Sequence, residues 1–219
     1  MLLNPQNLPK MFLNELNKKL WGWDWTKDPK IKVSVRSRVP LIIEKYPFFK
    51  SLNEKLIEES LKVSYPNCYN TNVQGKMSSW NLTSKNIEVL KTWISKVLYN
   101  SYDILEKVQE INFDEVWMSK YDKGDFCAYH THCLSWMSFV YFVKCPRGSA
   151  PLVLDGMRIK AEEGKLVAFP GIMNHHVPKN RCNDRIVIAG NLSVERKIKS
   201  FPVNFSTKIT QAVPSIPEG

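Results

Sequence analysis

The stretch "SWMSFVYFVKCPRGSAPLVLDGMRIKAEEGKLVAFP" (residues 135–170) decides the fold class, because it consists of short apolar runs separated mostly by Gly, Pro and polar residues. The runs are rich in β-branched and aromatic residues, which favours strands. Similar runs extend the pattern from "FDEVWMSKY" (113–121) to "RIVIAGNLSV" (185–194). Several strands in succession, with no helix between them, predict a sandwich or barrel of the jelly-roll type.

The sequence before residue 109 has helical periodicity instead. Apolar residues recur at helical spacing in residues 9–20, 49–62 and 84–106, and each segment is a predicted amphipathic helix. Residues 64–80 are rich in turn formers and predict an irregular loop. The predicted fold is therefore mainly β with N-terminal helices (α+β), built on a double-stranded β-helix (jelly-roll, cupin-like) core.

Three parts of the chain follow from this pattern. Residues 1–108 are expected to form a helical or mixed segment that packs on the barrel, and residues 109–200 the double-stranded β-helix core. Residues 201–219 are proline-marked and are expected to form an extended C-terminal tail.

The composition narrows the class of protein. The 219 residues are 43% hydrophobic and 24% charged, as in ordinary soluble domains. No apolar run approaches the roughly 18 residues of a membrane span, and the first twenty residues lack a secretory signal pattern. Five irregularly spaced cysteines fit reduced thiols better than disulfides. We therefore expect a cytoplasmic protein with no membrane partner.

The net charge of +10 suggests an anionic partner such as nucleic acid. However, the Lys and Arg residues are spread along the chain and form no basic block interleaved with aromatic residues. A lysine-rich surface is the preferred interpretation, and a nucleic-acid partner is disfavoured. Whether the chain forms a homo-oligomer stays open.

All four histidines fall into two clusters, "YHTH" (129–132) and "NHHV" (174–177). His130 and His132 are two residues apart, which places both side chains on one face of a strand. Strict alternation would turn Cys127 to the other face, and the chain has no C-x2-C pair, so a Cys/His zinc site is disfavoured. A His-x-His strand with His175 on a later strand predicts an open metal site. His176 is expected to face away.

Arg185 follows His175 by ten residues, at the start of a predicted strand. On that strand Arg185 and Asn191 share one face with the residues at every second position between them. An arginine inside a barrel is costly to bury without an anion, and its planar guanidinium suits a carboxylate. A metal beside it predicts a carboxylate-bearing ligand that spans both.

These residues resemble the iron(II)- and 2-oxoglutarate-dependent oxygenases. "YDKGDFCAYHTH" (121–132) is similar to their Tyr-x-x-Gly…His-x-Asp/Glu segment, and "GKLVAFPGIMNH" (164–175) to their later strand with the distal histidine. The resemblance covers about residues 40–195. It is closest to a bacterial and phage family of such oxygenases, through "FFKSLNEKLIEE", "SSWNL", "WMSKYDKGD", "SFVYFVKCP" and "GKLVAFP".

The resemblance implies a dioxygenase, hydroxylase-like, that couples oxidative decarboxylation of 2-oxoglutarate to oxidation of a substrate C–H bond. The implied cofactor is Fe(II), with 2-oxoglutarate as cosubstrate and O2 as oxidant. The substrate, a protein side chain or a small molecule, is not identified. The implied iron ligands and catalytic residues are His130, His132 and His175, and the implied cosubstrate-binding residues are Arg185, Asn191, Ser138 and Tyr121.

One position departs from the family pattern, because His132 stands where most members have a carboxylate. Either His132 completes a neutral three-histidine face, or a water or halide takes that position, or a carboxylate reaches it. Asp155 is open as that carboxylate, and Asp125 is disfavoured by strand parity. The narrower family itself tends to carry His-x-His, which favours His132.

Rival functions stay open. "GDFCAYHTH" (124–132) also fits the first cupin motif, which predicts a metal dioxygenase that does not use 2-oxoglutarate. That motif's glutamate is replaced by Trp136 and Met137, and cupins have no need of Arg185. A non-enzymatic jelly-roll binding module is favoured by the missing carboxylate and disfavoured by the retained arginine. Demethylation of nucleic acid is disfavoured, because Asn191 stands where such enzymes carry a second arginine.

Overall fold

The computed structural model describes residues 41–101 and 109–196. The predicted helix at 9–20 and the predicted tail at 201–219 lie outside these ranges. The described elements, in chain order, are β1 (Ile42–Lys45), α2 (Phe49–Ser60), β2 (Val73–Gln74), β3 (Lys76–Met77), α3 (Lys85–Ser101), β4 (Gln109–Tyr121), β5 (Phe126–His130), β6 (Met137–Lys144), β7 (Leu152–Leu154), β8 (Met157–Ile159), β9 (Lys165–Pro170), β10 (His175–Val177) and β11 (Arg185–Arg196).

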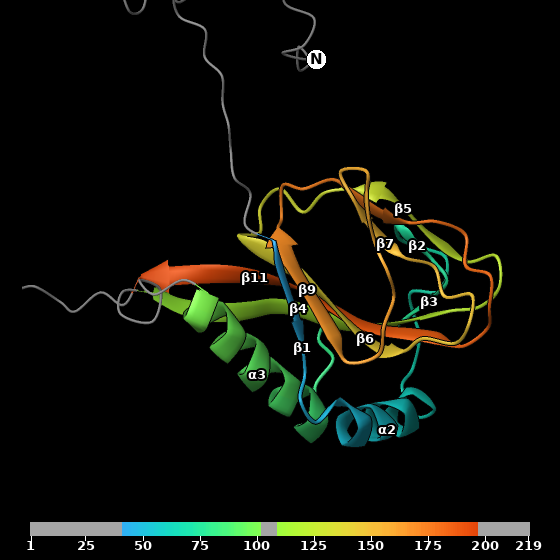
Figure 1. Ribbon diagram of the computed structural model, residues 1–219, viewed down its shortest axis with the longest axis horizontal. Helices are drawn as coiled ribbons and strands as arrows, with labels where there is room; N and C mark the ends of the chain where they lie inside the picture. The colour runs from blue at the N-terminus through green and yellow to red at the C-terminus, as the bar shows by residue number, and fades with distance from the viewer. Residues whose placement is uncertain (1–40, 102–108, 197–219) are drawn as a thin grey trace, which may run out of the picture. The chain divides into compact units, whose positions relative to one another are not determined.

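The strands form two sheets. The larger has the order β1-β9-β6-β11-β4-β3, and the smaller β2-β5-β10-β7-β8. Neighbouring strands are antiparallel in both sheets. Figure 1 shows both helices on one side of the larger sheet and the smaller sheet on its other side. The prediction of a mainly β chain with helices toward its N-terminal side is confirmed, although β1 precedes α2 and two further short strands precede α3.

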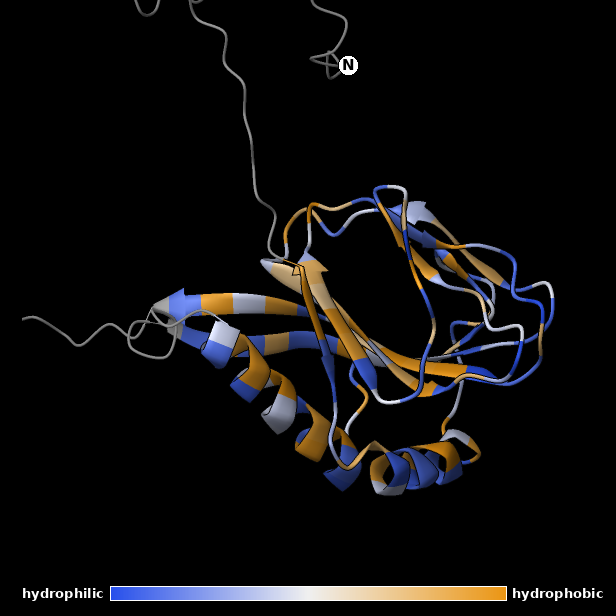
Figure 2. Ribbon diagram, in the orientation of Figure 1, coloured by the Kyte–Doolittle hydropathy of each residue, from blue (hydrophilic) through white to orange (hydrophobic). Residues whose placement is uncertain are grey.

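The larger sheet has an apolar core on each of its faces. Along β11, Ile186 and Ile188 belong to the core under the helices, whereas Val187 and Ala189 belong to the core between the two sheets. This alternation follows from the two-residue period of a strand, and Figure 2 shows apolar residues along the middle of β11, with hydrophilic residues at its ends. A strand with both faces buried therefore presents one row of side chains to each core.

The helices pack on the sheet through one apolar face each. The buried residues of α3 are Ile87, Leu90, Ile94 and Leu98, which recur at helical spacing. The Ser84 hydroxyl accepts a hydrogen bond from the Ile87 N–H at 3.1 Å and so caps the helix start. Neither helix in the described ranges combines the length and apolarity needed to cross a bilayer.

Two details of the first helical region differ from the prediction. The helix predicted at 49–62 ends at Ser60, and Leu61, the next residue, is 77% exposed. The stretch 64–80 contains two short strands, β2 and β3, rather than only loop. These strands lie at the edges of different sheets, so the segment connects the two layers. Both short strands form because their backbones pair with strands that are distant in the sequence, and the local sequence does not show this pairing.

Candidate metal centre

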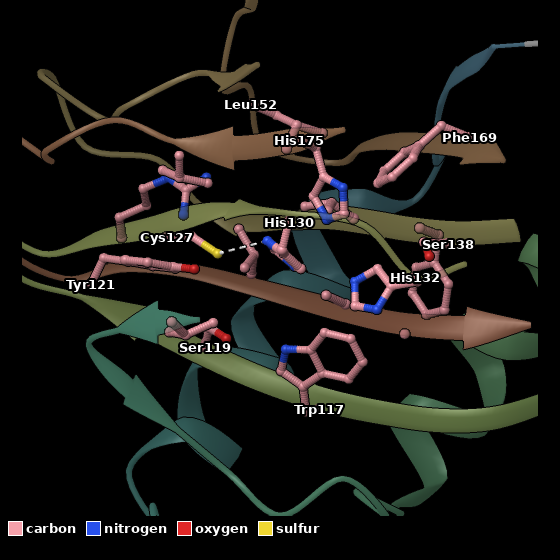
Figure 3. Close-up of a pocket in the computed structure, with 18 residues that line it drawn as sticks. Trp117, Ser119, Tyr121, Cys127, His130, His132, Ser138, Leu152, Phe169 and His175 are labelled. Atoms are coloured by element: carbon pink, nitrogen blue, oxygen red, sulfur yellow. Dashed lines mark hydrogen bonds between the residues drawn. The ribbon is translucent and has the colours of Figure 1, made fainter. Parts of the chain in front are cut away.

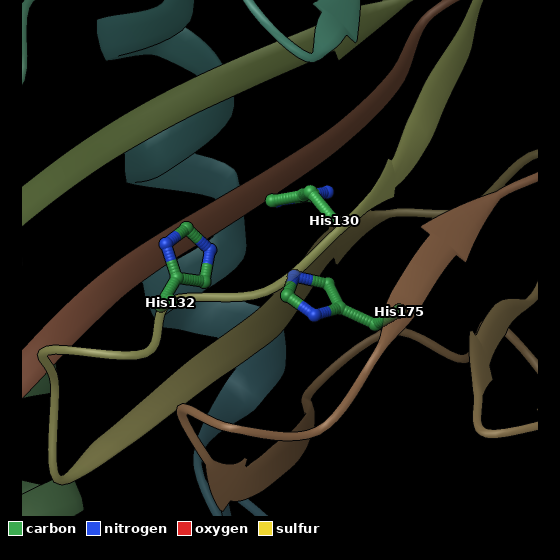
Figure 4. A group of neighbouring side chains, drawn as sticks. All are labelled: His130, His132 and His175. Carbon is green, nitrogen blue, oxygen red and sulfur yellow. The ribbon is translucent and has the colours of Figure 1, made fainter. Parts of the chain in front are cut away.

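Three histidines converge at one end of the space between the sheets (Figure 4). His130 ends β5, His132 follows it in the next loop, and His175 begins β10. One ligating nitrogen of each ring lies within 4.8 Å of the other two, and the ring centroids are 4.2–5.1 Å apart. The structure therefore brings together the three residues that the sequence singled out as metal ligands.

A β-bulge in β5 positions the first histidine. His175 pairs with His130 and Val177 pairs with Cys127, so three residue steps on β5 oppose two on β10. The extra residue reverses the alternation of side chains. As a result Cys127 faces the same cavity as His130, and its sulfur lies 3.9 Å from Nδ1 of that histidine. The prediction that Cys127 points away from the histidines was wrong.

The loop that carries His132 is held by the turn after β9. The His132 N–H donates a hydrogen bond to the Gly171 carbonyl at 2.7 Å. A Cβ at Gly171 would lie 2.4 Å from the carbonyl oxygens of both His132 and Ser135. Only glycine allows the two backbones to approach this closely.

Gly171→Ala is therefore expected to lower the free energy of unfolding by about 1–3 kcal/mol, the usual effect of overpacking. The clashing atoms are backbone, so the His132 loop must shift to relieve them. Urea denaturation of the two proteins measures the change. Ile172→Ala is the control, because that neighbouring side chain is 71% exposed and its loss should change stability by less than about 0.5 kcal/mol. Equal stability of wild type and Gly171→Ala would contradict the prediction.

Two of the histidines have a backbone carbonyl beside Nδ1. His130 Nδ1 lies 2.8 Å from the Ala128 oxygen, and His175 Nδ1 lies 3.1 Å from the Met173 oxygen. A carbonyl only accepts, so each Nδ1 carries the proton and each Nε2 keeps a free lone pair. Burial, with the neighbouring His130 adding to it, lowers the pKa of His175 to about 3 and that of His132 to about 4. Neutral imidazoles are the form that binds metal.

The stability of the metal-free protein is expected to fall as the pH drops below 6.5. In the unfolded chain the histidines protonate near their ordinary pKa of 6.5, whereas in the folded protein the pKa of His132 is about 4 and that of His175 about 3. The unfolded state binds more protons in this window, so acid favours unfolding; above pH 6.5 these groups contribute no pH dependence. Urea midpoints between about pH 7 and about pH 4.5 measure the decline. His175→Gln should make it shallower, and an unchanged slope would contradict this assignment.

Arg185 lies in the same cavity and has no polar partner among the residues that the structure describes. The side chain is fully buried, and Nε, Nη1 and Nη2 make no hydrogen bond to any residue within 41–101 and 109–196. The guanidinium carbon lies 4.8 Å from the Tyr121 ring and 5.5 Å from the Phe142 ring. Burial lowers the pKa of the guanidinium, yet arginine stays charged in proteins. A buried, unpaired cation with its donors free fits an anionic ligand.

The cavity connects the arginine with the histidines. Its walls are mostly apolar, and the same cavity is lined by Arg185, Tyr121, Ser138 and all three histidines. Figure 3 shows His130, His132 and His175 pointing toward one another, with Trp117 beside His132. A small anionic molecule in this cavity would contact the arginine and the metal position together.

Ser138 and Asn191, two predicted cosubstrate residues, bind one another beside His132. The Ser138 hydroxyl donates to Asn191 Oδ1 at 2.8 Å. Asn191 Nδ2 donates to Glu115 Oε2 at 2.6 Å and lies 3.4 Å from His132 Nδ1. The sequence interpretation missed Glu115. Glu115 could have been found, because it stands two and six residues before Trp117 and Tyr121 in "EVWMSKY" and so lies on the same face of the strand.

The remaining candidates lie elsewhere. Asp125 accepts hydrogen bonds from the Asp122 N–H and from Tyr69, and Asp155 is exposed in the turn between β7 and β8. The metal-ligating group found among the described residues includes neither carboxylate. His176 packs its ring against Tyr129, an exposed residue, at 5.3 Å and so faces away from the cluster.

Solved structures share this arrangement of strands. A viral collagen prolyl hydroxylase from Paramecium Bursaria Chlorella virus-1, in a 2-oxoglutarate (2OG) complex, matches 71% of this chain and 96% of its own at 14% identity, with a TM-score of 0.55. A Pseudomonas putida prolyl-4-hydroxylase matches 71% and 92% at 13% identity, with a TM-score of 0.56. The chain has the fold of these prolyl hydroxylases.

A third structure extends the likeness. It is a prolyl hydroxylase from Trichoplax adhaerens in complex with a hypoxia inducible factor oxygen degradation domain peptide fragment, and it matches 69% of this chain and 82% of its own at 10% identity, with a TM-score of 0.51. No protein-family model matches the sequence, and no curated protein does either. The likeness is therefore one of fold, and the chemistry has to be argued from the site.

Proposed function

We propose that this protein is an Fe(II)- and 2-oxoglutarate-dependent dioxygenase, and that it acts as a hydroxylase. The observation that carries the proposal is Arg185, a buried guanidinium in the cavity of a three-histidine cluster, whose three nitrogens have no partner in the described part of the chain. A metal site alone would suit many oxidases. A metal site beside a buried arginine without a hydrogen-bond partner in the described ranges favours a ligand that binds the metal at one end and carries a carboxylate at the other.

We also propose that residues 109–200 form a double-stranded β-helix. Except for the β7–β8 hairpin, strands that follow one another from β4 to β11 lie in opposite sheets. This succession winds the chain between the two layers and brings the start of β10 to the end of β5. The fold of the similar hydroxylase structures supports the assignment.

The residues present fit the cofactor. His130 and His175 offer free Nε2 lone pairs, and His132 turns a ring nitrogen toward them (Figure 4). A face of imidazole ligands with open positions suits Fe(II). We propose that His130, His132 and His175 would hold the iron, and that bound iron with 2-oxoglutarate and O2 would supply the oxidation of a substrate C–H bond.

The chain itself would bind, orient and exclude water. Two parallel hydrogen bonds from Arg185 would fix the far carboxylate of 2-oxoglutarate, with the Tyr121 ring holding the guanidinium from one side. Ser138 and Asn191 would support His132 and the adjacent cavity wall. The apolar walls, including Phe169 and Leu152, would keep the site dry.

An anaerobic titration tests the proposal. Metal-free protein receives Fe(II) and then 2-oxoglutarate, and we expect a weak visible charge-transfer band that needs both components. Fe(II) binding without the band would favour a cupin-type metal dioxygenase that does not use 2-oxoglutarate. No metal binding at all would leave a non-enzymatic binding module. Since one of the similar structures holds a peptide fragment, peptides are the first substrates to screen, followed by small molecules.

A further inference from the structure

The three histidines differ in what lies beside Nδ1. His130 and His175 each face a backbone carbonyl, at 2.8 Å and 3.1 Å. His132 faces the side-chain amide of Asn191, whose Nδ2 lies 3.4 Å from His132 Nδ1. A carbonyl oxygen can only accept a hydrogen bond, and an amide nitrogen can only donate one. Nδ1 therefore faces a hydrogen-bond acceptor in His130 and His175, but a hydrogen-bond donor in His132.

Glu115 decides which end of the Asn191 amide faces His132. The carboxylate is only an acceptor, and it lies 2.6 Å from Asn191 Nδ2, so the amide nitrogen must point that way. The other end, Oδ1, accepts from the Ser138 hydroxyl at 2.8 Å. Turning the amide over would set Oδ1 against the carboxylate, two acceptors in contact. The Ser138 hydroxyl could also accept a hydrogen bond, so it is the Glu115 carboxylate that fixes the orientation of Asn191.

A second β-bulge lies directly beside Glu115, which itself keeps the regular register of β4 against β11. Asn191 pairs with Glu115 and Leu192 pairs with Phe113, so β4 carries an extra residue, Asp114, between them. Phe113 belongs with the residues packed on the helix-side core, whereas Glu115 lies on the cavity side with Asn191. Bulges often re-aim side chains next to active sites.

We infer that Glu115, acting through Asn191, holds His132 in the tautomer whose proton is on Nε2, the nitrogen that faces the other two histidines. Glu115 and Asn191 are positioning residues, and the inference rests on the proposed metal site. It makes His132 the weakest of the three ligands. To bind metal through Nε2, His132 must move its proton to Nδ1, where it would meet the N–H of Asn191.

The imidazole nitrogens of the metal-free protein test the tautomer directly. The chain has four histidines, so a two-dimensional 15N–1H spectrum of labelled protein can be assigned with single His→Gln variants. We expect the unprotonated nitrogen to be Nδ1 in His132 and Nε2 in His130 and His175. An unprotonated Nε2 in His132 would overturn the inference, and it would leave the proposed function untouched.

Glu115→Gln tests the role of the carboxylate. The glutamine amide can donate to Asn191 Oδ1, which lets Asn191 turn over and accept from His132 Nδ1–H. We expect the His132 tautomer to shift and Fe(II), measured anaerobically by calorimetry, to bind about tenfold more tightly, within the range of changes around metal ligands. Asp114→Asn is the matched control. It removes the same charge one residue away, from the exposed Asp114 carboxylate, which accepts from the Ser193 hydroxyl, and it should change neither quantity.

The two tests separate the possible failures. The predicted tautomers in a protein that binds no Fe(II) would support the inference about Glu115 and refute the proposed function. Fe(II) binding that is equal in wild type and Glu115→Gln, with an unchanged His132 spectrum, would overturn the inference and leave the proposed function standing. Weaker Fe(II) binding in Glu115→Gln would also overturn the inference, because that result is expected if the Glu115 carboxylate helps His132 to bind the metal.

Discussion

Arg185→Met is expected to stabilise the metal-free protein and to abolish binding of 2-oxoglutarate to the iron-loaded protein. In the wild type the guanidinium is fully buried and its three nitrogens have no partner within the described ranges. Replacing buried charges by apolar groups of similar volume is often neutral or stabilising by 1–4 kcal/mol. We therefore expect the free energy of unfolding to rise by about 1–3 kcal/mol, measured by urea denaturation without ligand.

The same substitution removes both hydrogen bonds to the far carboxylate. Hydrogen bonds to charged groups contribute about 1.5–3 kcal/mol each, so 2-oxoglutarate affinity should fall by more than about 100-fold. Arg158→Met is the control, because Arg158 is exposed on β8 and should change stability by less than about 0.5 kcal/mol. An Arg185→Met protein that is less stable and still binds 2-oxoglutarate would show that the arginine serves the fold and not a ligand.

His175→Ala is expected to weaken Fe(II) binding by more than about 100-fold, beyond what changes around metal ligands usually cause. His175 is buried at the centre of the cluster, and its ring centroid lies 4.2 Å from that of His130 and 5.1 Å from that of His132. Anaerobic calorimetry measures the affinity. Circular dichroism at the same temperature checks that the variant is folded.

The neighbouring residue provides the control for this experiment. His176→Ala removes the same side chain one position later, from the face that packs on Tyr129, and should leave Fe(II) affinity within about twofold. If His132 is the weakest ligand, His132→Ala should weaken binding less than His175→Ala does. Equal losses for His175→Ala and His176→Ala would mean that the metal binds outside the cluster.

Much of this arrangement could be predicted from alternation along single strands. On β11 the period of two placed Arg185 and Asn191 on one face, and the structure has Arg185 in the cavity and Asn191 beside His132. His176 facing away followed from the same rule. The succession of apolar runs after residue 109 predicted the strands because their β-branched and aromatic content differs so clearly from the helical segments before them.

The errors come from places where pairing between strands overrides alternation. Cys127 faces the cavity because β5 gains a residue against β10. Glu115, by contrast, alternates regularly with Trp117 and Tyr121 against β11, so strand parity could have found it. A bulge is set by the partner strand as much as by its own residues. The sequence of one strand therefore could not reveal the bulge in β5, which lies next to the histidines.

The two cores on either side of β11 have a consequence for how this protein can change. Ile186 and Ile188 maintain the packing under the helices, while Arg185 and Val187 shape the cavity. Substitutions at the odd-numbered positions of β11 can therefore alter ligand preference without changing the apolar core under the helices. In a library randomised along this strand, substitutions at even positions should be lost through poor expression, and those at odd positions through altered chemistry.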